Sequence, residues 1–138
     1  MIVVDSSAII AILRLEPEVD TFLRVIAAAD GVEMSAHSAL EVALALAGAD
    51  REPAVWAPFD QLVERAGIVI APLDREQCRR GREAFLRFGK GRHPAGLNLG
   101  DCASYALASV REAPLLFKGN DFAKTDVESA VAGGGPVH

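Results

Sequence analysis

Short apolar runs alternate along the chain with longer stretches in which apolar residues recur every three or four positions. Four runs rich in Val, Ile and Leu predict buried strands, at residues 2–4, 32–34, 68–71 and 115–117. The helical spacing predicts six helices between them, at residues 6–13, 17–29, 36–47, 53–66, 74–88 and 99–111. Strands that alternate with helices in this way favour an α/β fold, in which helices cover both faces of a parallel sheet.

The length of 138 residues suits a single domain, which we place at residues 1–132. The glycines at 133–135 and Pro136 predict a flexible tail at 133–138. No apolar stretch approaches the ~20 residues that cross a bilayer, and Asp5 stands too early for a secretory signal. We therefore expect a cytoplasmic protein with no membrane partner, whose two cysteines, Cys78 and Cys102, are reduced.

Charge is distributed unevenly along the chain. The 14 basic and 19 acidic residues give a net charge of -5. From Arg75 to Arg92, however, seven basic residues stand against two acidic ones, a local +5, so the rest carries seven basic and seventeen acidic residues, a net of -10. Such a basic strip can hold a polyanion on an acidic protein, because the field acts locally. A solvated helix face whose arginine stems cover apolar surface explains it equally well.

Four acidic residues stand at predicted strand ends or near helix starts: Asp5, Glu41, Asp101 and Asp121. Each has an ordinary structural explanation, because acidic side chains at these positions cap helices and turns. Ser38 to Glu41 and Asn98 to Asp101 both have the spacing of a capping box. Taken singly, none of the four indicates a catalytic site.

Taken together, the four positions fall at one edge of a parallel sheet, where ligands of such folds bind. Carboxylates that meet without matching cations raise one another's pKa and destabilise the fold, so we expect a divalent cation among them. Oxygen ligands favour Mg²⁺ or Mn²⁺, whereas the scattered histidines and cysteines give no zinc pattern. Ser7, two residues after Asp5, is either a helix N-cap or a hydroxyl that orients this carboxylate.

Four segments carry a resemblance to a known family: Ile2 to Ala8, Ser38 to Glu41, residues 89–102 and Leu115 to Phe122. In order and spacing they resemble the PIN-domain ribonucleases, and within that family the VapC toxins of bacterial type II toxin-antitoxin systems, over the chain to about Glu128. The resemblance implies a three-layer sandwich with about five parallel strands. It also implies Mg²⁺- or Mn²⁺-dependent cleavage of RNA of the tRNA or rRNA class, growth arrest, a homodimer and neutralisation by a VapB-type antitoxin.

The resemblance also implies roles for individual residues. Asp5 and Asp101 would be direct metal ligands, while Glu41 and Asp121 would hold a second ion or the water around the first. Asp121 matches the most variable of the family's acidic positions. Asn120 stands where a second acid could lie, Asp126 is a less favoured substitute for Asp121, and Ser7 matches a hydroxyl position that orients the first Asp. The candidate RNA contacts are Arg79, Arg82, Arg87, Lys90 and Arg92.

Three other functions compete with this one. A signalling receiver domain has a similar length and an acidic magnesium pocket, but it needs an acceptor Asp after its third strand, where this chain has Ala71 and Pro72. A phosphatase of the haloacid dehalogenase type needs a second Asp two residues after Asp5, where this chain has Ser7. An acidic pocket that binds a partner without catalysis is compatible with the sequence.

Overall fold

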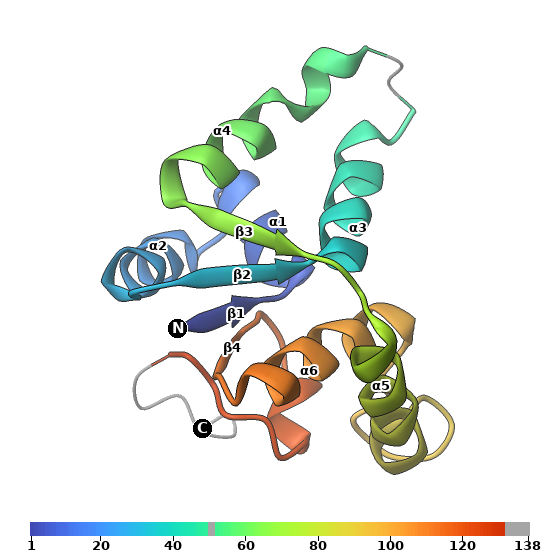
Figure 1. The fold of residues 1–138 in the computed structure, drawn as a ribbon. Coiled ribbons are helices and arrows are strands. Elements are labelled where there is room, and N and C mark those ends of the chain that lie inside the picture. The colour runs from blue at the N-terminus through green and yellow to red at the C-terminus, as the bar shows by residue number, and fades with distance from the viewer. Residues whose placement is uncertain (50–51, 132–138) are drawn as a thin grey trace.

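The computed structural model describes residues 1–49 and 52–131, and the tail predicted at 133–138 lies outside them. Four parallel strands form one sheet in the order β3-β2-β1-β4 (Figure 1). They are β1 (Ile2–Val4), β2 (Val32–Ser35), β3 (Ile68–Ala71) and β4 (Leu115–Leu116). The predicted strands are confirmed, but the expected count of about five is too high. The chain after β4 makes a single parallel bridge, from Ser129 to Leu115, at the place of a further strand.

The described residues also form six α-helices and two short 3-10 turns. They are α1 (Ser6–Leu13), α2 (Val19–Ala28), α3 (Ala36–Ala47), η1 (Pro53–Trp56), α4 (Ala57–Ala66), α5 (Arg75–Phe88), α6 (Leu99–Arg111) and η2 (Phe122–Lys124). The single helix predicted over 53–66 divides into η1 and α4, because Pro58 has no N–H with which to continue the hydrogen-bond ladder. None of the described helices is both long and apolar enough to cross a membrane.

The alternation of side chains along each strand separates two cores. Ile2 and Val4 face a cluster with residues of α1, α2, α3 and α4, whereas Val3 between them faces a cluster with residues of α5 and α6. On β4, Leu116 belongs to the first cluster and Leu115 to the second. Helices therefore cover both faces of the sheet, which confirms the three-layer sandwich.

The parallel arrangement determines where functional side chains meet. All four strands end at the same edge of the sheet, and α1 and α3 begin there directly after β1 and β2. Asp5 follows β1 and its backbone N–H donates to the carbonyl of Leu116 at 2.9 Å, so the pairing with β4 continues to the edge. Side chains of α3, α6 and the chain after β4 can therefore reach Asp5.

Candidate active site

Asp5 is the most deeply buried acidic residue of the edge, with 3% of its surface exposed. Its carboxylate accepts two hydrogen bonds, from the backbone N–H of Ser7 to Oδ2 at 3.0 Å and from the hydroxyl of Ser104 to Oδ1. The hydroxyl oxygen of Ser7 accepts a bond from the backbone N–H of Lys118 at 3.0 Å. Ser7 thus orients Asp5 through its backbone, and its hydroxyl joins α1 to the chain after β4.

Glu41 reaches the same edge from α3. This helix begins at Ala36 with Ser35 as its N-cap, so the capping role considered for Ser38 is wrong. The hydroxyl of Ser6 donates to Glu41 Oε1 at 3.4 Å, and Nδ1 of His37 lies 3.6 Å from the same oxygen. Burial raises the pKa of Glu41, and the negative charge of Asp5 raises it further, against the opposing effect of His37.

The backbone of α6 makes room for the Glu41 carboxylate at Gly100. A Cβ atom at this position would collide with both carboxylate oxygens of Glu41. Gly100 is buried within the first turn of α6 and has a helical conformation, so no turn or positive φ requires a glycine there. A side chain at Gly100 would therefore have to displace the Glu41 carboxylate.

Asp101 takes part in the capping of α6 and also interacts with the other acidic residues of the edge. It forms a capping box with Asn98, in which each backbone N–H donates to the other side chain, at 2.9 and 3.1 Å. Burial raises the pKa of Asp101 to about 6; the backbone bond at Asn98 opposes this, and the charges of Asp5, Asp121 and Glu41 add to it. The capping residue of α6 is therefore also a member of the acidic cluster.

The chain after β4 contributes Asp121 to the cluster and directs Asp126 elsewhere. Asp121 and its neighbour Asn120 are exposed, and Asp121 is near enough to raise the pKa of Asp101. Asp126 accepts hydrogen bonds from the hydroxyl of Tyr105 and from Nη2 of Arg87, the latter at 3.3 Å. The structure thus brings Asp5, Glu41, Asp101 and Asp121 together and pairs Asp126 with α5 and α6.

In the described part of the chain, His37 beside Glu41 is the only basic side chain within ion-pair distance of this cluster. Within residues 1–49 and 52–131, none of the four carboxylates forms an ion pair with Lys or Arg. In the same part of the chain, no group of three or more His, Cys, Asp or Glu side chains is placed to hold a metal ion. Mg²⁺ does not require such a group, because it usually binds one or two carboxylates and completes its shell with water and substrate phosphate. The oxygen-only donors fit Mg²⁺ or Mn²⁺ and do not fit structural zinc.

The basic strip is partly neutralised by its own helix. Arg79 contacts Glu76 and Glu83, and Arg80 contacts Glu76. The Arg79 and Arg80 guanidinium groups lower the pKa of Glu76 to about 2. Arg87 pairs with Asp126. Four of the strip's exposed basic residues have no acidic partner in the described part of the chain: Arg75, Arg82, Lys90 and Arg92.

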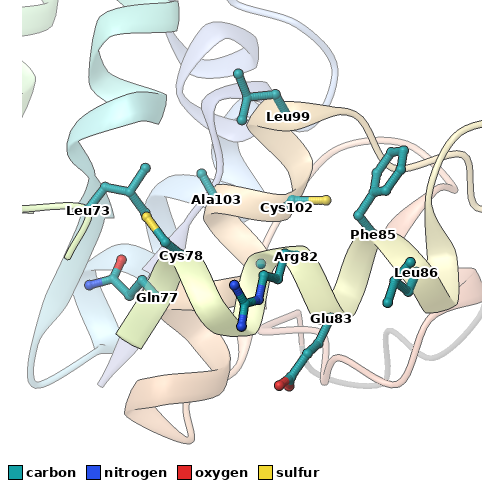
Figure 2. Close-up of a pocket in the computed structure, with 11 residues that line it drawn as sticks. Leu73, Gln77, Cys78, Arg82, Glu83, Phe85, Leu86, Leu99, Cys102 and Ala103 are labelled. Carbon is teal, nitrogen blue, oxygen red and sulfur yellow. The ribbon is translucent and has the colours of Figure 1, made fainter. Parts of the chain in front are cut away.

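A separate groove of 790 Å³ lies between α5 and α6 (Figure 2). Apolar side chains form most of its lining, among them Phe85 and Leu86 of α5 and Leu99 of α6. Leu99 and Cys102 flank Asp101 in sequence, yet none of the four acidic residues lines the groove. The groove is therefore separate from the acidic cluster.

Three residues of the site could not be recognised from the sequence. Ser104 donates to Asp5, Ser38 lies behind Ser104, and Gly100 accommodates Glu41. The available signal was spacing, because Ser104 stands one helical turn after Asp101 and Ser38 one turn before Glu41. A hydroxyl one turn from an acid is too common to indicate a site without the fold.

Known proteins resemble this sequence over most of its length. The PIN domain family matches residues 2–128. Ribonuclease VapC28 of Mycobacterium tuberculosis is 47% identical over 130 residues, which cover 94% of this chain and 97% of the relative. Ribonuclease VapC of Mycolicibacterium smegmatis is 43% identical over 125 residues, 91% of this chain and 96% of the relative. The chain therefore belongs to the PIN-domain family, in which these relatives are VapC ribonucleases.

Solved structures show the same fold at low sequence identity. The crystal structure of Mycobacterium tuberculosis VapC20, described as a toxin that cleaves the sarcin-ricin loop, aligns with a TM-score of 0.71 and 17% identity, covering 92% of this chain and 96% of that one. A toxin-antitoxin complex from Klebsiella pneumoniae aligns with a TM-score of 0.68 and 16% identity, covering 91% and 93%. Family membership sets aside the receiver and phosphatase alternatives.

Proposed function

We propose that the protein is a Mg²⁺- or Mn²⁺-dependent endoribonuclease toxin of the VapC type, which cleaves RNA phosphodiesters and arrests growth. The observation that carries this proposal is the meeting of four carboxylates at one sheet edge, with no Lys or Arg to neutralise them in the described part of the chain. An arrangement that raises the pKa of its own members is costly unless a ligand of opposite charge binds there. The identity of 47% to a VapC ribonuclease over nearly the whole chain supports the activity.

In this proposal Asp5 and Asp101 bind the cation directly, because Asp5 is buried at the end of β1 and burial of Asp101 raises its pKa. Glu41 and Asp121 lie on either side and hold a second ion or the surrounding water. When bound, the cation supplies Lewis acidity: it lowers the pKa of water and offsets charge on the phosphoryl oxygens. The contribution of the chain is to hold the carboxylates together and oriented before substrate arrives.

An RNA backbone would be repelled by the acidic cluster alone, so binding needs the basic strip. Lys90 and Arg92, in the loop that leads into α6, are better placed to contact phosphates than Arg79, whose charge is matched by Glu76 and Glu83. Arg82 and Arg87 complete the candidate set. The family relationship favours a structured RNA of the tRNA or rRNA class as substrate, and it favours action in the cytoplasm.

The proposed partners are a VapB-type antitoxin and a second copy of the chain. The antitoxin is supported by the fold shared with a toxin of a toxin-antitoxin complex. Growth arrest on expression of the protein, relieved by co-expression of the small neighbouring gene product, tests the toxin function. Normal growth on expression of soluble protein would contradict it.

The enzymatic proposal is tested by incubating the purified protein with tRNA and rRNA in Mg²⁺, in Mn²⁺ and in EDTA. We expect discrete cleavage products with either cation and none with EDTA. The Asp101→Asn variant, purified in the same way, is the control for contaminating ribonuclease. Equal cleavage by this variant, or by the wild type in EDTA, would contradict the proposal.

A further inference from the structure

A chain of three buried polar groups lies behind the acidic cluster. Ser38 and Ser104 are fully buried and Asp5 is 3% exposed. The Ser104 hydroxyl donates to Asp5 Oδ1, and the hydroxyl oxygens of Ser38 and Ser104 lie 3.0 Å apart. Since Ser104 has one hydroxyl proton and gives it to the carboxylate, Ser38 must donate to Ser104. The hydrogen bonds therefore run in one direction, from Ser38 to Ser104 and from Ser104 to Asp5.

The two serines come from the helices that carry the other acids of the cluster. Ser38 stands three residues before Glu41 on α3, and Ser104 three residues after Asp101 on α6. Residues three apart lie on the same side of a helix. Each helix thus presents one carboxylate to the cluster and, one turn away and more deeply buried, one hydroxyl to the chain that ends at Asp5.

The hydrogen bonds determine how Asp5 can turn. Oδ1 accepts from Ser104 and Oδ2 accepts from the N–H of Ser7, so one donor holds each oxygen. A carboxylate oxygen accepts two hydrogen bonds or ligands, which leaves one position free on each. Rotation of the carboxylate would break both bonds at a residue that is only 3% exposed, and it would leave the buried Ser104 hydroxyl without its acceptor.

We propose that Ser104, supported by Ser38, is a positioning residue that fixes the orientation of the Asp5 carboxylate for binding a divalent cation. The proposal rests on the proposed function, because it assigns Asp5 to the cation. Partners that orient a metal ligand through a hydrogen bond typically contribute about 10–100-fold to metal affinity. Ser104 touches neither substrate nor cation and acts only through Asp5.

The test is Mn²⁺ affinity, measured by isothermal titration calorimetry on the purified full chain without RNA. Ser104→Ala should weaken Mn²⁺ binding about 10–100-fold, and Ser104→Thr, which keeps the hydroxyl, should bind more tightly than Ser104→Ala. Ser38→Ala should produce a smaller loss in the same direction, because the bond from Ser104 to Asp5 survives. Ser109→Ala is the matched control: it removes a hydroxyl of α6 that contacts Arg80 and should leave the affinity unchanged.

Cleavage of RNA, assayed on the same samples, separates the two proposals. The Ser104→Ala variant should recover cleavage as Mn²⁺ is raised, whereas a variant with only a packing defect would show a lower melting temperature and an unchanged Mn²⁺ affinity. Affinity within about threefold of the wild type in Ser104→Ala would overturn the role of Ser104. If Ser104→Ala does not fold, Ser38→Ala is used in its place, and a Mn²⁺ affinity within about threefold of the wild type would then overturn the proposal. A wild type that binds Mn²⁺ but cleaves no RNA would overturn the nuclease function and leave this test intact.

Discussion

The backbone of Gly100 lies directly against the carboxylate of Glu41, so a Cβ atom at Gly100 would occupy the position of the carboxylate oxygens. The two residues belong to different helices, and their contact sets how far Glu41 extends toward Asp5 and Asp101. The contact joins α3 and α6, two of the helices that supply the acidic cluster.

Gly100→Ala should therefore damage the site and not the fold. The end of the Glu41 side chain can move aside, and alanine in a helical conformation leaves the free energy of unfolding unchanged or raises it by up to about 1 kcal/mol. Mn²⁺ affinity and RNA cleavage should both fall. Gly81→Ala is the matched control on α5: its Cβ would lie 3.5 Å from the carbonyl oxygen of Cys102, an ordinary contact, so cleavage should not change. Equal cleavage by the two variants would show that the position of Glu41 is unimportant.

Removal of one negative charge should abolish activity without loss of stability. Asp5→Asn and Asp101→Asn each delete a proposed cation ligand and also relieve repulsion within the cluster. We expect no RNA cleavage and, in EDTA, a melting temperature equal to or above that of the wild type. If Asp101→Asn instead melted lower and kept full activity per folded molecule, its bonds to Asn98 would be its main role.

Stability without metal should depend on pH through Asp101. Its pKa rises from 3.8 to about 6 on folding, so its protonated form stabilises the native state below pH about 4 and this contribution is lost as pH rises through 6. The unfolding free energy of Asp101→Asn minus that of the wild type should therefore increase between pH 4.5 and 7.5 in EDTA. Urea denaturation of both proteins at the two pH values measures this difference in unfolding free energy. A difference that does not change with pH would show that folding does not raise the pKa of Asp101. Mn²⁺ must displace the proton, so its affinity for the wild type should also fall below pH about 6.

The fold could be predicted from the sequence more completely than the site. Short apolar runs identified all four strands, because parallel strands buried between helix layers are built mainly from apolar residues. The expectation of a fifth strand was wrong, because the chain around Ser129 pairs with the sheet at one position only. No local sequence pattern predicts such an isolated bridge. The acids were found because each follows a strand or opens a helix. Ser104 and Gly100 were missed because their importance lies in contacts with Asp5 and Glu41, which are distant in sequence.

The acids after β4 should separate into two roles. Asp121→Asn should reduce cleavage with little effect on stability, since Asp121 is exposed and lies beside Asp101. Asp126→Asn should lower the free energy of unfolding by about 1 kcal/mol, through weaker bonds to Tyr105 and Arg87, and leave cleavage per folded molecule unchanged. Thermal melting and cleavage rates of both variants check this. The opposite pattern would make Asp126 the fourth acid of the site.

The basic strip should divide into RNA contacts and structural ion pairs. In an Asp101→Asn background, which prevents cleavage, Lys90→Ala and Arg92→Ala should each weaken RNA binding and reduce the salt dependence of log K by about 0.7–0.9 for each phosphate that the variant no longer neutralises. Arg79→Gln is the control, because Glu76 and Glu83 already match its charge. Fluorescence anisotropy with labelled RNA over a range of salt concentrations measures these slopes. Unchanged slopes for Lys90→Ala and Arg92→Ala would remove the loop from the RNA site.

The account depends on a divalent cation bound among carboxylates from separate elements of the fold. The most direct measurement is the anomalous difference map of a crystal grown with Mn²⁺. We predict a peak in contact with the carboxylates of Asp5 and Asp101, and its absence from crystals of Asp5→Asn. A map with no peak there, or a peak coordinated only by residues outside the cluster, would contradict the account.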